Sequence, residues 1–143
     1  MRVNEVVKSK EIQQVVTIAP DATVEELIAL LAQHNIGAVV VSADGSSLDG
    51  IVSERDVVRR LPQGVDVLRG PVSSIMTAAV HTCDGTESLE ELARLMTDQR
   101  VRHVPVVVDG ALTSVISIGD VVKSRIEELE FERDQLDQYV HAT

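Results

Sequence analysis

Two Ser-x-x-Asp spacings in the sequence could bind a nucleotide. They are Ser53 with Asp56 and Ser117 with Asp120, and each follows a β-branched apolar run and precedes a segment with helical character. At such a strand-to-helix junction, a carboxylate can accept hydrogen bonds from both hydroxyls of a ribose. The Ser hydroxyl and the unpaired amides of the helix N-terminus suit a phosphate. Because adenosine nucleotides carry both groups, they are the ligand class that this chemistry favours.

The same spacing also has a purely structural explanation. A Ser followed three positions later by an acidic residue can form a capping box, in which each side chain bonds the backbone amide of the other. The sequence leaves both roles open, and one junction can serve both.

Catalytic constellations are not found in the sequence. Cys83 has no C-x-x-C partner, and His34, His81, His103 and His141 lack the spacing of a zinc site or of a nucleophile with its base. We therefore expect a protein that is not an enzyme and that requires no cofactor or metal.

Charge and aromatic content argue against nucleic acid and membrane partners. The chain has 13 Lys and Arg against 23 Asp and Glu, with one Phe, one Tyr and no Trp. It therefore lacks both the basic surface and the stacking platforms that nucleic acid requires. A hydrophobic content of 44 % indicates a folded core. The single Cys, the short apolar runs and the polar start of the sequence lead us to expect a cytoplasmic protein.

An internal repeat organises the chain. With a shift of 65 residues, TIAPDATVEELIALLAQHNIGAVVV from Thr17 aligns with TCDGTESLEELARLMTDQRVRHVPV from Thr82. The shift falls to 64 after an Asp-Gly turn, and LDGIVSERDVV from Leu48 then aligns with LTSVISIGDVV from Leu112. Because the length change lies at a turn and the register recovers beyond it, both copies share one supersecondary unit.

Each copy is predicted to contain a strand, an amphipathic helix, a β-hairpin and a second helix. Apolar residues recur at helical spacing after Thr23 and Ser88, which are candidate N-caps with acidic residues in the following turn. The other expected elements are strands at 15–18 and 80–82, hairpins built on 38–41 and 104–108, and short helices at 3–7 and 72–76.

The pattern divides the chain into a leading segment (1–14), a first copy (15–61), a linker (62–71), a second copy (72–125) and a helical extension (126–143). Pro62 should end the helix that follows Asp56. The helix after Asp120 should reach about Val140 and carry an apolar stripe of Val122, Ile126, Leu129, Leu136 and Val140. The stripe would pack on the chain's own body or on the same helix of a second copy, and we expect a homodimer.

These motifs resemble the cystathionine-β-synthase (CBS) domain family, in which tandem motifs pair into a regulatory module. The resemblance covers nearly the whole chain, and its markers are the strands at 36–41 and 101–106 with GIVSERD from Gly50 and SVISIGD from Ser114. It implies a mixed α/β (α+β) fold of two β-α-β-β-α motifs packed as a pseudo-twofold pair, with a long C-terminal helix. It also implies a stand-alone CBS pair.

By position, the resemblance implies two ligand clefts between the motifs. The first would be lined by Asp56, Ser53, Arg55, Ile51, His81, Val101, Arg102 and His103. The second would be lined by Asp120, Ser117, Gly119, Val115, Val16, Ile36, Gly37 and Ala38. Arg55 and Arg102 are the expected phosphate partners, because a guanidinium makes bidentate charge-assisted bonds. Since the copies differ at these positions, the clefts should not be equivalent.

Our hypothesis is a regulatory module that binds an adenosine nucleotide between its motifs and signals energy or redox state to an unidentified protein partner. AMP is favoured, with ADP, ATP, NAD(H) or S-adenosylmethionine as alternatives. The rival hypothesis is a structural or protein-interaction homodimer without a ligand, in which the Ser-x-x-Asp junctions only cap helices.

Overall fold

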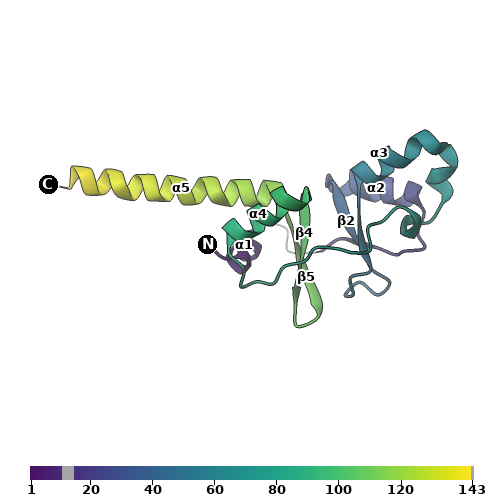
Figure 1. Cartoon of the computed structure of the whole chain (residues 1–143), viewed down its shortest axis with the longest axis horizontal. Coiled ribbons are helices and arrows are strands. Elements are labelled where there is room, and N and C mark those ends of the chain that lie inside the picture. The colour runs from purple at the N-terminus through teal and green to yellow at the C-terminus, as the bar shows by residue number, and fades with distance from the viewer. Residues whose placement is uncertain (11–14, 143) are drawn as a thin grey trace.

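The computed structural model describes residues 1–10 and 15–142, which form two lobes side by side with one long helix projecting from the second lobe (Figure 1). Residues 11–14 of the predicted leading segment and residue 143 of the predicted helical extension lie outside the described residues. The first lobe contains a sheet of β1 (Thr17–Ile18), β2 (Ala38–Val41) and β3 (Gly50–Ser53). In it, β1 runs parallel and β3 antiparallel to β2. The second lobe contains the antiparallel hairpin of β4 (His103–Val108) and β5 (Ala111–Ser117). The predicted mixed α/β fold of two motifs is confirmed.

The amphipathic helix of each copy begins at its predicted N-cap. In α2 (Val24–His34), Thr23 and Glu26 form a complete capping box. In α4 (Leu89–Gln99), the Ser88 hydroxyl accepts from the Glu91 amide at 3.1 Å. These bonds satisfy amides that the first helical turn leaves unpaired. The apolar face of each helix then packs on the sheet of its own lobe.

The strand predicted at 80–82 is wrong, because those residues form no strand and the pairing is a single bridge one residue further on, at Cys83. Cys83 donates to the Pro105 carbonyl at 3.1 Å and accepts from the Val107 amide at 2.9 Å, which places it parallel to Val106. Pro105 has no amide hydrogen with which to continue the ladder toward His81. The first copy has Val40 in place of Pro105, and its strand extends over two residues.

The short helix that precedes each copy packs on the lobe of the other copy. Val3 of α1 (Val3–Ser9) is buried in the second lobe, and its amide donates to the Glu87 carbonyl at 2.9 Å. The segment predicted as a helix at 72–76 begins with one 3-10 turn, η3 (Val72–Ser74), whose first residue is buried in the first lobe. Each short helix therefore packs on the copy that it does not precede.

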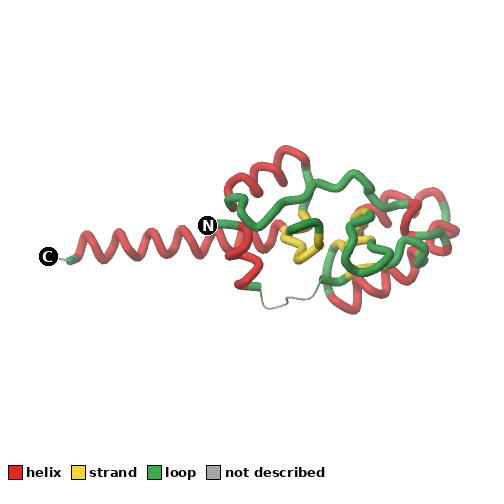
Figure 2. Tube along the Cα trace, turned by 90° about the horizontal axis from the view of Figure 1, so that it is seen from below, coloured by secondary structure: helices red, strands yellow, loops and turns green. Residues whose placement is uncertain are grey.

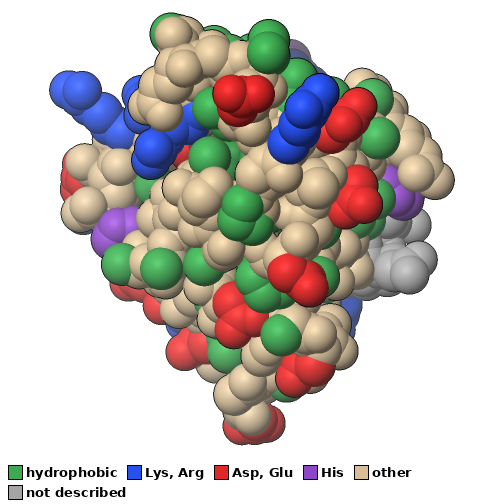
Figure 3. All heavy atoms as spheres, turned by 90° about the vertical axis from the view of Figure 1, so that its right-hand side faces the viewer, with side chains coloured by type: hydrophobic (Ala, Val, Ile, Leu, Met, Phe, Trp, Pro, Cys, Tyr) green, Lys and Arg blue, Asp and Glu red, His purple; other side chains and the backbone are tan. Residues whose placement is uncertain are grey.

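The linker between the copies is ordered. Helix α3 (Glu54–Arg60) ends just before Pro62, as predicted, and two 3-10 helices follow, η1 (Leu61–Gln63) and η2 (Val65–Arg69). The outer end of the first lobe faces the viewer in Figure 3, where acidic, basic and apolar side chains are interspersed.

The last helix, α5 (Ile118–His141), continues well beyond the second lobe (Figure 1). Its predicted apolar stripe is exposed, from 47 % at Leu129 to 66 % at Val140. In the described part of the chain, no helix is both long and apolar enough to cross a membrane.

Candidate functional site

Two cavities open between the lobes, and each is lined by the Ser and the Asp of one Ser-x-x-Asp junction. Figure 2 shows the strands of both lobes next to each other near the middle of the molecule, and the cavities draw residues from both. The cavity at Asp56 has a volume of about 570 Å³, and the cavity at Asp120 has a volume of about 390 Å³. Both volumes lie in the range of small-molecule sites.

The Asp56 cavity is lined by every residue predicted for it. These are Asp56, Ser53, Arg55, Ile51, His81, Val101, Arg102 and His103. The structure thus brings residues of the first lobe together with the second-copy residues predicted to lie across the pseudo-twofold.

The Asp120 cavity is lined by its predicted residues with one exception. Asp120, Ser117, Val115, Val16, Ile36, Gly37 and Ala38 line it. Gly119 instead lies in an exposed groove on α5 beside Ile118 and Val122. Gly119 therefore does not line the Asp120 cavity, because the second residue of α5 lies on the side of the helix that carries those two residues.

Both junctions form complete capping boxes, which confirms the structural role. The Ser53 amide donates to Asp56 Oδ2 at 2.8 Å, and the Asp56 amide donates to Ser53 Oγ at 3.4 Å. At the second junction the corresponding distances are 2.9 Å and 3.1 Å. Each carboxylate is thus held at a cleft by its own helix.

The two carboxylates differ in their other partners. Asp56 Oδ2 also accepts from the Ser53 hydroxyl at 3.1 Å, whereas Asp120 Oδ2 lies 3.1 Å from Lys10 Nζ. Burial raises the pKa of Asp120, but the Ser117 amide and the Lys10 ammonium outweigh it and hold that pKa below its ordinary value. The Asp120 carboxylate is therefore ionised and already paired.

Sequence reasoning missed two arginines of the Asp56 cavity. Arg59 and Arg100 line it together with Arg55 and Arg102, against the carboxylates of Glu54 and Asp56. Arg59 lies one helical turn after Arg55, so helical spacing could have found it. Arg100 ends α4 in a left-handed conformation, with φ of 55°. The cavity thus gathers positive charge on a chain whose formal net charge is −10.

His103 lines both cavities. Burial lowers its pKa, and Arg102 and Lys10 act in the same direction, while the carboxylates of Asp120 and Glu54 oppose them. These surroundings favour the neutral form of the imidazole, which lies between the two sites.

The Asp120 cavity also contains residues that the sequence did not suggest. His34 and Asn35 come from the end of α2, and Lys10 comes from the end of α1. Lys10 carries no recognisable sequence signal, because its position depends on the packing of α1 on the second lobe. Within residues 1–10 and 15–142, no cluster of His, Cys, Asp and Glu could hold a metal ion.

Comparison with known proteins agrees with this architecture. The family model of the CBS domain matches residues 5–63 and 72–127. The chain therefore belongs to the CBS-domain family and contains two copies of the domain.

Relatives and solved structures with this fold come from several organisms. The chain is 37 % identical over 125 residues to the mitochondrial CBS domain-containing protein CBSX3 of Arabidopsis thaliana, covering 84 % of this chain and 61 % of that protein. The crystal structure of the CBS-domain containing protein ATU1752 from Agrobacterium tumefaciens superposes with a TM-score of 0.83 at 42 % identity, over 87 % of this chain and 99 % of that one. The structure of the CBS domain protein PAE2072 from Pyrobaculum aerophilum, complexed with AMP, superposes with a TM-score of 0.75 at 31 % identity, over 84 % of this chain and 89 % of that one.

Proposed function

We propose that this protein is a non-catalytic regulatory module that binds an adenosine nucleotide between its two CBS motifs. The observation that carries the proposal is the cavity of about 570 Å³ that joins Ser53 and Asp56 to four arginines. The carboxylate suits the ribose hydroxyls, and the guanidinium groups suit a phosphate. One cleft thus has partners for both ends of a nucleoside monophosphate.

AMP is the favoured ligand. Local positive charge must overcome the net charge of −10 before an anion can bind, and the arginines of the Asp56 cleft supply it. The AMP complex of PAE2072, 31 % identical to this chain, supports the same ligand class. ADP, ATP, NAD(H) and S-adenosylmethionine remain the alternatives.

Occupancy of the cleft would be signalled to a protein partner of the cytoplasm. The cleft lies between the lobes, so a ligand bound there contacts both lobes. Such a ligand stabilises the arrangement of the lobes that it fits best and shifts the protein toward it. We also propose a homodimer, in which the exposed stripe on α5 meets a second copy.

A rival function is favoured by one observation. Both Ser-x-x-Asp junctions complete capping boxes between their own Ser and Asp groups, so the motif would be satisfied in a purely structural or protein-interaction module. This rival does not account for the arginines around Asp56, and for that reason we rank it second.

A thermal-shift titration separates the two functions. A ligand that binds only the native state raises the melting temperature with concentration. We expect AMP to do so, and ADP, ATP, NAD, NADH and S-adenosylmethionine serve as the comparison set. If none of these compounds raises the melting temperature at millimolar concentration, the structural module is the correct function.

A further inference from the structure

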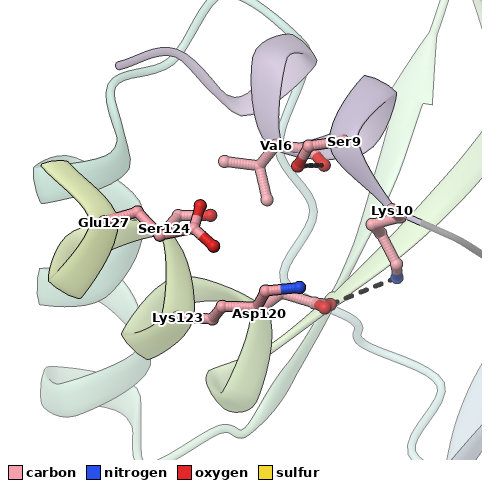
Figure 4. A pocket seen from close by; sticks show the side chains of 7 residues that line it. All are labelled: Val6, Ser9, Lys10, Asp120, Lys123, Ser124 and Glu127. Atoms are coloured by element: carbon pink, nitrogen blue, oxygen red, sulfur yellow. Dashed lines mark hydrogen bonds and ion pairs between the residues drawn. The ribbon is translucent and has the colours of Figure 1, made fainter.

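Lys10 lies where two cavities meet. Its side chain lines the Asp120 cleft and also a cavity of about 440 Å³ between α1 and α5, which includes Ser9 and Lys123 (Figure 4). Lys10 directly follows α1, so the packing of that helix on the second lobe places the ammonium beside Asp120.

The Lys10 ammonium holds the carboxylate that would bind the ribose in this cleft. Its Nζ lies 3.1 Å from Asp120 Oδ2 and donates to the Val115 carbonyl. The ion pair is largely buried, with side-chain exposures of 23 % for Lys10 and 24 % for Asp120. A ribose that bonds Asp120 through both of its hydroxyls uses both carboxylate oxygens, so it competes with the ammonium for Oδ2.

Moving the ammonium has a different consequence for neutral and for anionic ligands. A neutral nucleoside leaves the ammonium partly buried without its carboxylate, and an unpaired buried charge is costly. A ligand with an anionic 5′ group offers a new partner, and an ammonium–phosphate bond is charge-assisted like the one it replaces.

We propose that Lys10 makes the Asp120 cleft selective for adenosine ligands that carry an anionic 5′ group over neutral adenosine compounds. The proposal rests on the proposed function, since it concerns the ligand class of one of the two clefts. Lys10 acts as an internal cation that exchanges Asp120 for the phosphate of the ligand.

The Asp56 cleft differs in this respect. In the described part of the chain, both hydrogen bonds to the Asp56 carboxylate come from Ser53, and no ion pair engages this carboxylate. A nucleoside need not displace a cation there. The selectivity that we assign to Lys10 is therefore a property of the Asp120 cleft alone.

Calorimetric titration with adenosine and with AMP tests the proposal. The titrations use the Asp56→Ala background, so that binding reports on the Asp120 cleft. In that background, Lys10→Met keeps the aliphatic stem and removes the charge. We expect adenosine to bind roughly fivefold more tightly after the change, with AMP binding unchanged or weaker, because only the neutral ligand is relieved of the ion pair. Lys10→Arg should retain most of the selectivity.

The matched control is Arg94→Met, which removes one positive charge from an exposed position on α4. An AMP-to-adenosine affinity ratio that stays equal in Lys10→Met and Arg94→Met overturns the role of Lys10. A fall in adenosine affinity in Lys10→Met overturns it as well, as does binding that vanishes in the Asp56→Ala background. Failure of the wild-type protein to bind either compound instead refutes the proposed function itself.

Discussion

Asp56 Oδ2 accepts two hydrogen bonds from Ser53, one from its amide at 2.8 Å and one from its hydroxyl at 3.1 Å. The same carboxylate lines the larger cleft between the lobes. One side chain therefore closes the capping box of α3 and stands where we propose that a ribose binds, and mutation can separate the two roles.

Replacement of Asp56 by Ala should reduce AMP affinity more than stability. Loss of a cap costs about 1 kcal/mol of unfolding free energy, whereas loss of hydrogen bonds to a charged acceptor costs about 1.5–3 kcal/mol of binding free energy. Calorimetry and thermal melts measure the two effects. Glu26→Ala is the matched control, because it removes the same capping partner from α2 outside the clefts. Asp56→Ala with unchanged AMP affinity would show that the residue is only a cap.

Arg102 should supply a large part of the affinity increment from adenosine to AMP. At the Asp56 cleft, which Arg102 lines, Arg102→Ala is expected to remove most of that increment and to leave adenosine binding nearly intact, because only the phosphate needs a cation. Arg102→Lys should restore it in part, since a point charge replaces a planar fork. Arg94→Ala provides a control at an exposed site. Equal binding of adenosine and AMP by the wild-type protein would refute the phosphate assignment.

Stability should fall as the pH drops through the range where free histidine titrates. Burial lowers the pKa of His103, with Arg102 and Lys10 acting in the same direction and Asp120 and Glu54 opposing. Below a pH of about 6.5 the unfolded chain binds a proton at this residue before the folded one does. The stability contribution is thus complete above that pH and is lost as the pH falls toward the lowered pKa.

Thermal melts between pH 7.5 and 5.5 check this pH dependence. His103→Gln should flatten the decline, whereas His141→Gln, exposed near the end of α5, should leave it unchanged. An identical decline in both variants would mean that His103 does not cause it.

Cys83 should be inert to thiol reagents in the folded protein. Burial, together with Glu87 and Asp84, raises the pKa of its thiol to about 12, so the reactive thiolate is scarce at pH 8. Ellman's reagent should titrate no thiol in the native state and one thiol per chain in guanidinium chloride. Rapid reaction of the native protein would contradict the burial of this residue.

The stripe on α5 should stabilise the homodimer. Leu129 is 47 % exposed within one chain, and a charge placed there would be buried against the second copy. Leu129→Glu should therefore raise the dimer dissociation constant at least tenfold, as measured by light scattering over a dilution series. Phe131→Glu is the control, because Phe131 is 62 % exposed on the same helix but lies off the stripe. A monomeric wild-type protein at micromolar concentration would refute the dimer.

The sequence by itself determined where the helices of this protein are capped and where α3 ends. The cap at Thr23, the capping boxes at Ser53 and Ser117 and the end of α3 before Pro62 all depend on residues within four positions of each other. Such contacts can be deduced from spacing. The repeat extended this reasoning to both lobes, and the family resemblance predicted which residues face each other across them.

The tertiary structure decided the features that depend on partners far apart in the chain. Pro105 shortened the strand at Cys83 through a missing amide on a neighbouring strand. The packing of α1 on the second lobe places Lys10 beside Asp120, which is 110 positions away in the sequence. Spacing along the chain cannot predict such pairs. Burial of apolar side chains such as Val3 determines where α1 packs, and the position of the backbone then determines where a charged residue such as Lys10 lies.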